Sequence, residues 1–237
     1  MMHHDLRPEL AAALARAGGV IRRGAHALDP AAPTCEACLH EVLHLAQHPE
    51  ATALLDTDDA QILDSRSIND ASWGSDEART AGMLPLLIAL DRTWGQPEVQ
   101  RSAARWIALG TVRRVLPVAL RACGLDASAC ESAGTLAAQF AAAQFAAAQF
   151  AAAPSHRTAA QFAAAAARSA AAAGYRAAAR SAADAARSAA SAAQSAADAA
   201  RSAASAVPAS EQPAFLRLAV AVWVDAIERA ERGEVCP

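Results

Sequence analysis

Lysine is absent from this sequence, so all 21 basic residues are arginine. Set against 24 acidic residues, they leave a formal net charge of −3. Domains that bind nucleic acid usually carry a clearly positive charge gathered into a basic stripe, and neither feature is present. The charge pattern therefore predicts that nucleic acid is not a partner of this chain.

Long apolar runs and an export signal are lacking too. Residues 1–8 do not combine a basic start with an apolar run, as a secretory signal does. Each apolar stretch of about 20 residues is interrupted by Arg, Asp, Gln or Ser, which argues against a membrane-spanning helix. We expect a cytoplasmic protein without a membrane partner, whose five cysteines, an odd number, are free thiols.

The common motifs of catalysis and nucleotide binding are also missing. No glycine-rich phosphate loop is present, because Gly18 and Gly19 lack the required spacing and the preceding strand. No Gly-x-Ser-x-Gly element marks a serine nucleophile. We therefore identify no catalytic residue and expect no cofactor, which leaves open only an enzyme whose site the fold assembles from distant residues.

What the chain has instead is alanine, the strongest helix former. Hydrophobic residues make up 54% of the sequence, but many of them are alanine, and the large ones lie mostly before residue 125 and after residue 213. This predicts an all-α fold, a multi-helix bundle with long alanine-rich helices packed as a hairpin. Three regions are expected: an N-terminal helical region (1–133), the alanine-rich repeat (134–207), and a C-terminal amphipathic helix (208–237) that packs back on the N-terminal core.

Helix start and stop signals divide the two outer regions. Ser75 is expected to cap one helix that is kinked at Pro85, while Gly110 and Pro117 bend or divide another. Ser210 and Pro213 open the last helix, which Gly233 closes. Besides this last helix, the pattern predicts helices over residues 6–17, 34–48, 76–90 and 97–122.

The repeat begins with a five-residue unit, Ala-Gln-Phe-Ala-Ala, that brings Phe140, Phe145 and Phe150 into successive copies. On an α-helix these rings would point about 140° apart and could not share one face. Either this helix is surrounded by partners or the segment is not helical. The unit also resembles the pentapeptide repeat, which builds a four-sided β-helix, so both structures stay open for residues 137–151.

A second period, of seven residues, covers residues 184–204 and leaves a broad face of alanine. Neighbouring helices can approach closely over such a face. The opposite side carries arginine and aspartate at i,i+3 and i,i+4 spacing, which suits ion pairs on a solvated surface. We predict that these residues contact a partner: Arg180, Asp184, Arg187, Asp198 and Arg201.

A cluster of possible metal ligands lies in the first half, where Cys35 and Cys38 precede His40, His44 and His48. On one helix from Thr34, the cysteines would share the apolar side and the histidines would form a stripe on the other. We expect buried cysteines and a solvated histidine face, with a metal site or a redox dithiol as alternatives.

An acidic run lies just beyond, with Asp56, Asp58 and Asp59. It lacks the glycine and the glutamate of an EF-hand loop, and is expected to be solvated.

Residues 103–137 contain Ala-Arg-Trp-Ile-Ala at 104–108, Val-Arg-Arg-Val-Leu-Pro at 112–117 and a turn at Asp126, and the long alanine tract follows. With these features the chain resembles a loose group of alanine-rich bacterial proteins associated with polymorphic-toxin systems, some of which are described as immunity proteins. The resemblance extends over about half of the chain. It implies that the protein neutralises a toxin by binding it, and it implies no catalytic residues.

The leading hypothesis is therefore a non-enzymatic helical protein that binds another protein, with toxin immunity as its most specific form. A second hypothesis is a structural protein whose repeat helices associate with those of a second copy. A third is a metal-dependent enzyme that uses Asp or Glu with His from the first half of the chain.

Overall fold

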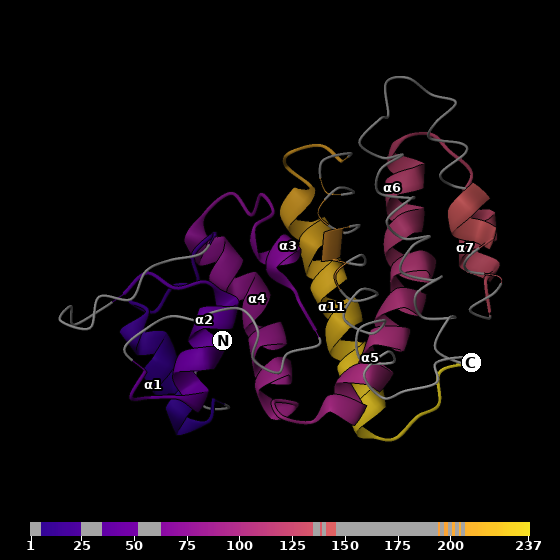
Figure 1. Cartoon of the computed structure of the whole chain (residues 1–237). Helices are drawn as coiled ribbons and strands as arrows, with labels where there is room; N and C mark the ends of the chain where they lie inside the picture. The colour runs from indigo at the N-terminus through magenta and orange to yellow at the C-terminus, as the bar shows by residue number, and fades with distance from the viewer. Residues whose placement is uncertain are drawn as a thin grey trace.

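The computed structural model describes residues 6–24, 35–51, 63–134, 138, 141–145, 194, 197–198, 201, 204 and 207–237, and all regular secondary structure among them is helical. Within this part it has eight α-helices, one π-helical turn and no strand (Figure 1). The predicted all-α class is confirmed. The hairpin predicted for the repeat helices lies outside the described residues.

The first two helices, α1 (Pro8–Arg16) and α2 (Leu39–Gln47), pack against each other at one end of the molecule (Figure 1). α1 matches the predicted helix, but the start predicted for α2 at residue 34 is wrong. Cys38 is the N-cap of α2, because the Glu41 carboxylate accepts a hydrogen bond from the Cys38 amide in a capping box. Residues 35–38 are therefore outside the helix.

A short helix, α3 (Arg66–Asn69), precedes the 17-residue helix α4 (Asp76–Arg92). The predicted cap of α4 is confirmed, because Ser75 Oγ accepts a hydrogen bond from the Ala78 amide at 3.1 Å. Gly82 is required within α4, since a Cβ there would collide with the buried ring of Trp73.

The predicted helix over residues 97–122 consists of α5 (Pro97–Gly110), the π-helical turn η2 (Thr111–Val115) and α6 (Leu116–Ala122). The wide register of η2 shows in the Leu116 amide, which donates to the Thr111 carbonyl five residues earlier. Pro117 explains this turn, because proline has no amide hydrogen and its ring would clash with the carbonyl of Arg113 in a regular α-helix. A short helix, α7 (Ser128–Ser132), follows.

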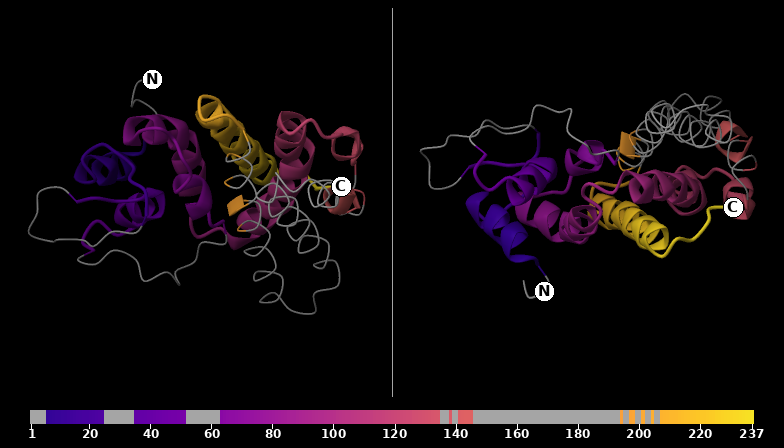
Figure 2. Two further views of the ribbon diagram at one scale, coloured as in Figure 1. Left: turned by 90° about the horizontal axis from the view of Figure 1, so that it is seen from above. Right: turned by 60° about the horizontal axis from the view of Figure 1, so that its bottom comes forward.

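The last helix, α11 (Gln212–Glu231), lies between α4 and α5 and packs against both (Figures 1 and 2). Trp223 and Ile227 are buried on it within the single core that runs through all these helices. A Cβ on Gly110 of α5 would lie 2.5 Å from Val222 Cγ1, so the absence of a side chain at Gly110 allows this close approach of α5 and α11. Gly233, in the left-handed conformation, follows the helix as predicted.

The described residues of the repeat fit helical periodicity. Residues 141–145 are helical and Phe145 is half exposed, so the β-helix alternative is wrong for this stretch. Ala197 and Ala204, seven residues apart, are buried, whereas Gln194 and Arg201 are exposed. This agrees with the predicted alanine face.

The boundaries of the three predicted regions stay a prediction. No helix in the described part of the chain is long and apolar enough to cross a bilayer.

Candidate functional site

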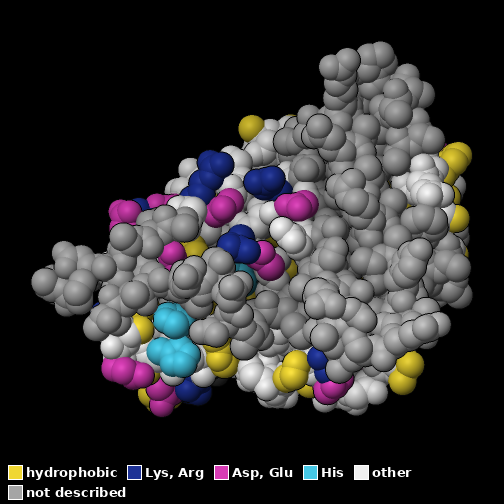
Figure 3. All heavy atoms as spheres, in the orientation of Figure 1, with side chains coloured by type: hydrophobic (Ala, Val, Ile, Leu, Met, Phe, Trp, Pro, Cys, Tyr) yellow, Lys and Arg dark blue, Asp and Glu magenta, His cyan; other side chains and the backbone are white. Residues whose placement is uncertain are grey.

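The histidine cluster of α2 is divided between the core and the surface. His40 is buried, while His44 is half-buried and His48 is exposed. The ring centres of His44 and His48 are 4.8 Å apart. Histidine side chains accordingly gather on the surface over the α1–α2 end of the molecule (Figure 3). The expectation of a solvated histidine face is therefore wrong at His40, because the irregular segment at residues 63–65 covers that side of α2.

His40 accepts a hydrogen bond from the Ser65 amide through Nε2, at 3.1 Å, and the Ser65 hydroxyl lies 3.1 Å from the same nitrogen. Because an amide can only donate, this nitrogen is the unprotonated one and the ring is neutral. Burial lowers the pKa of His40, and the Asp64 carboxylate at 3.8 Å opposes that shift only in part. Ser65 is completely buried, so this pair holds residues 63–65 on α2 and offers no nucleophile to a substrate.

The cysteines before α2 do not form a metal site with these histidines. Cys38 is buried, as expected, and Cys35 is half-buried; both are free thiols. Burial raises the pKa of Cys38 to about 12, which keeps the thiol protonated at neutral pH. In the residues that the structure describes, no three His, Cys, Asp or Glu side chains are placed to hold a metal ion. Asp56, Asp58 and Asp59 lie outside those residues.

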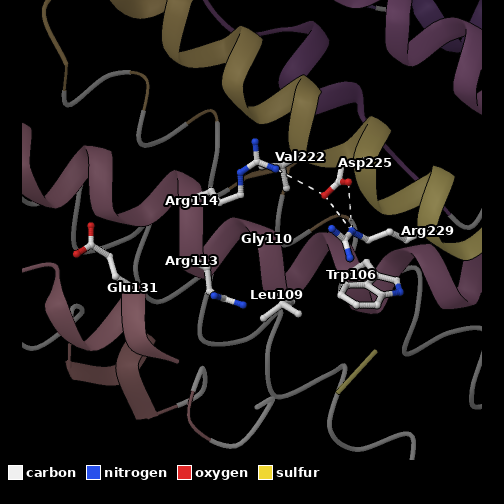
Figure 4. A pocket seen from close by; sticks show the side chains of 9 residues that line it. All are labelled: Trp106, Leu109, Gly110, Arg113, Arg114, Glu131, Val222, Asp225 and Arg229. Atoms are coloured by element: carbon white, nitrogen blue, oxygen red, sulfur yellow. Dashed lines mark hydrogen bonds and ion pairs between the residues drawn. The ribbon is translucent and has the colours of Figure 1, made fainter. Parts of the chain in front are cut away.

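A hollow of about 290 Å³ lies where α5, η2, α7 and α11 meet (Figure 4). We name it the arginine hollow, because three guanidinium groups surround it together with one tryptophan ring. Its described lining consists of Trp106, Leu109, Gly110, Arg113, Arg114, Glu131, Val222, Asp225 and Arg229.

The π-helical turn places two of the arginines on the rim of this hollow. Thr111, Val112 and Val115 of η2 are buried in the core, whereas Arg113 and Arg114, between them, are exposed. π-Helical turns within longer helices are rare and are frequent at functional sites. The core therefore holds the backbone of η2 and leaves its two consecutive guanidinium groups in contact with solvent.

The third arginine joins α11 to the tryptophan of α5. The Arg229 guanidinium lies over the Trp106 ring, 4.8 Å from its centre, and its Nε donates to both carboxylate oxygens of Asp225 at 3.2 Å. The hydrogen bond with Asp225 is the main cause that raises the pKa of Arg229. Figure 4 shows Asp225 between Arg229 and Arg114, whose Nη1 lies 3.6 Å from it.

One arginine in the described lining of the arginine hollow has no charged partner. Its carboxylates already have partners, since Asp225 binds Arg229 and Arg114 while Glu131 forms an ion pair with Arg121 outside the hollow. Arg113 has no ion pair or hydrogen bond of its side chain within the described part of the chain. Among the described lining residues, Arg113 is thus the guanidinium that has no carboxylate partner.

The predicted partner-binding residues are mostly not placed. Arg180, Asp184 and Arg187 lie outside the described residues. Asp198 is half-buried and accepts a hydrogen bond from the Ser67 hydroxyl of α3, while Arg201 is exposed. The hydrogen bond shows that Asp198 helps to join the repeat to α3.

Sequence reasoning did not identify the arginine hollow. A usable signal existed, because Gly110 and Pro117 marked an irregular turn with Arg113 and Arg114 inside it.

Known proteins give no independent indication of what this site does. No protein-family model, curated protein or solved structure matches this chain. The arrangement of charges and aromatic surface around the arginine hollow is therefore the basis for a function.

Proposed function

We propose that this protein acts by binding another protein, and that the arginine hollow is part of the contact surface. The observation that carries the proposal is the grouping of Arg113, Arg114 and Arg229 with Trp106 on helices held by one core. Arginine and tryptophan are the residues over-represented among those that dominate the energy of protein interfaces. Their fixed backbone would limit the conformational entropy that is lost on binding.

A protein partner suits the dimensions of the hollow better than a small molecule does. Its volume of about 290 Å³ is at the lower end of the range for small-molecule pockets. The side chains of Arg114 and Asp225 are 48% and 43% exposed, so they form a rim and not an enclosed wall. Such a rim can surround one or two side chains that project from a larger surface.

Toxin immunity is the most specific form of this proposal, and the sequence resemblance supports it. An immunity protein needs only to cover the functional surface of a toxin, so it requires neither a catalytic residue nor a cofactor. In this proposal the protein acts in the cytoplasm. Its repeat helices pack as a hairpin that presents Arg180, Asp184, Arg187 and Arg201 as a second contact surface.

Site-specific photo-crosslinking in the source cell tests the proposal. A benzophenone amino acid replaces Glu131, an exposed residue of α7 that lines the hollow, in one version of the full chain, so that the three arginines are kept. In the control it replaces Glu77, an exposed residue in the first turn of α4. We expect one protein to be crosslinked at position 131 and not at position 77. Equal crosslinking at both positions, or none at either, would contradict binding through the arginine hollow.

Self-association is a second candidate, favoured by an apolar hollow of about 340 Å³ between α4 and α11. Small side chains line part of it, including Ala81, Gly82 and Ala221, and small residues allow two helices to approach closely. The mass of the purified chain in solution separates the two candidates. A stable dimer whose formation is blocked by Ala221→Arg would favour the scaffold function over binding of a different protein.

A further inference from the structure

We infer that the arginine hollow receives an acidic segment of the partner protein, with a carboxylate of that segment bound by Arg113 and Arg114. This inference rests on the proposed function and specifies the chemistry of the partner surface. It is carried by two observations, the recognition of an acidic residue within the chain itself and the arginine without a partner in the described lining, together with the chemistry of the guanidinium group.

The chain already holds one acidic residue at the edge of this site. The carboxylate of Glu234 accepts hydrogen bonds from Arg229 at 3.1 Å and from Arg232 at 2.8 Å. The backbone carbonyl of Glu234 accepts a third from the Trp106 indole at 3.3 Å. Arg229 thus binds the side chain of an acidic residue and Trp106 binds its backbone. We expect an acidic residue of the partner to be bound by the same kinds of contact.

The unmatched charge lies at the other end of the hollow, on η2. Asp225 lies between Arg229 and Arg114, so its single negative charge is shared by two guanidinium groups. Arg113 has no such partner within the described part of the chain. One carboxylate of a partner protein near Arg113 and Arg114 would pair with Arg113, the guanidinium that has no carboxylate partner among the described lining residues.

The donors favour a carboxylate over other anions. A planar guanidinium presents paired N–H groups that match the two oxygens of a carboxylate. A phosphate group would bring close to two negative charges beside the one guanidinium of the described lining that lacks a partner, and near the carboxylates of Asp225 and Glu131. A carboxylate brings a single negative charge, so Asp225 and Glu131 repel it less than they would repel a phosphate.

A direct binding measurement tests the inference with the full chain. The probe is a dye-labelled peptide of six glutamates, and the matched peptide of six glutamines is its neutral control. Fluorescence anisotropy at low salt is suitable, because exposed charge pairs are weakened by screening. We expect the glutamate peptide to bind and the glutamine peptide not to bind, with affinity that falls as salt is added.

Two substitutions locate the bound peptide. Arg113→Gln is expected to weaken glutamate-peptide binding about fivefold, as loss of one exposed charge pair of about 1 kcal/mol predicts. Arg101→Gln is the matched control, because Arg101 is an arginine of α5 that binds Glu98 and is not part of the hollow. Circular dichroism shows whether each variant keeps its helices, so that a loss of binding is not confused with unfolding.

The possible results separate this inference from the proposed function. The inference is overturned if the glutamate peptide does not bind, if Arg113→Gln and Arg101→Gln weaken it equally, or if only a phosphoserine peptide binds. In those cases a specific crosslink at position 131 would leave protein binding intact with a different partner chemistry. If the crosslink is absent although the glutamate peptide binds at Arg113, the site recognises carboxylates but the proposed function fails.

Discussion

Around His40 the polar atoms are buried against one another, whereas around Arg113 they are left in contact with solvent. The His40 ring and Ser65 are both buried and are joined by hydrogen bonds. In the arginine hollow the guanidinium groups lie on a rim, and that of Arg113 has no partner within the described residues. Buried and satisfied polar groups fix a fold, while exposed and unmatched ones leave interaction energy available for binding.

The first and largest test of this comparison is His40→Ala. The substitution leaves the Ser65 amide buried without an acceptor and opens a cavity beside α2. We expect the free energy of unfolding to fall by about 2–4 kcal/mol, measured by urea denaturation. His48→Ala, at the other end of α2, is the control, because His48 is exposed and its loss should cost less than about 0.5 kcal/mol. Equal losses for the two variants would show that His40 does not hold this region.

The pH dependence of stability sharpens the same comparison. Because burial lowers the pKa of His40 in the folded protein, the unfolded chain binds the proton more readily. The stabilisation is complete above the ordinary histidine pKa of about 6.5 and is lost as the pH falls below it, through the folded pKa. We expect urea denaturation of the wild type to show a loss of at most about 1.4 kcal/mol per pH unit from this group.

His40→Gln is the control for the pH experiment, since it removes the titrating ring. Asp64 and Asp76 also have lowered pKa values, but they titrate below the ordinary aspartate pKa of about 3.9. Their contribution is therefore separated from the window of His40. If His40→Gln loses stability between pH 6.5 and pH 5 as steeply as the wild type does, His40 is not the group responsible.

The features that sequence predicted best are those that depend on neighbours along the chain. Ser75 caps α4 and Gly233 follows α11 because a cap requires only one side chain or one backbone conformation near a helix end. The start of α2 was missed, although the Glu41 side chain three residues after Cys38 is a usable capping-box signal. Cysteine is an unusual N-cap, and the apolar pattern alone extended the helix too far.

The features that sequence missed depend on contacts between distant segments. The burial of His40 requires the segment at residues 63–65, whose position no periodicity indicates. Gly110 and Pro117 predicted an irregular turn, but not that it would place Arg113 and Arg114 beside the Asp225 and Arg229 of the last helix. Local pattern thus predicted the backbone of the candidate site, whereas the packing of α11 on α5 determined its charges.

The smallest expected change in stability is that of Arg113→Gln, which tests the comparison at the arginine hollow. Arg113 is exposed and makes no ion pair within the described residues, so its substitution should change the free energy of unfolding by less than about 0.5 kcal/mol in urea denaturation.

The matched variant for this last measurement is Arg79→Gln. Arg79 is buried, donates to the Asn69 carbonyl at 2.8 Å and forms an ion pair with Asp76, so its loss should cost about 1.5–3 kcal/mol. A loss at Arg113 as large as that at Arg79 would mean that this guanidinium contributes to the fold. The distinction between a satisfied core and a surface left available for a partner would then not hold at this site.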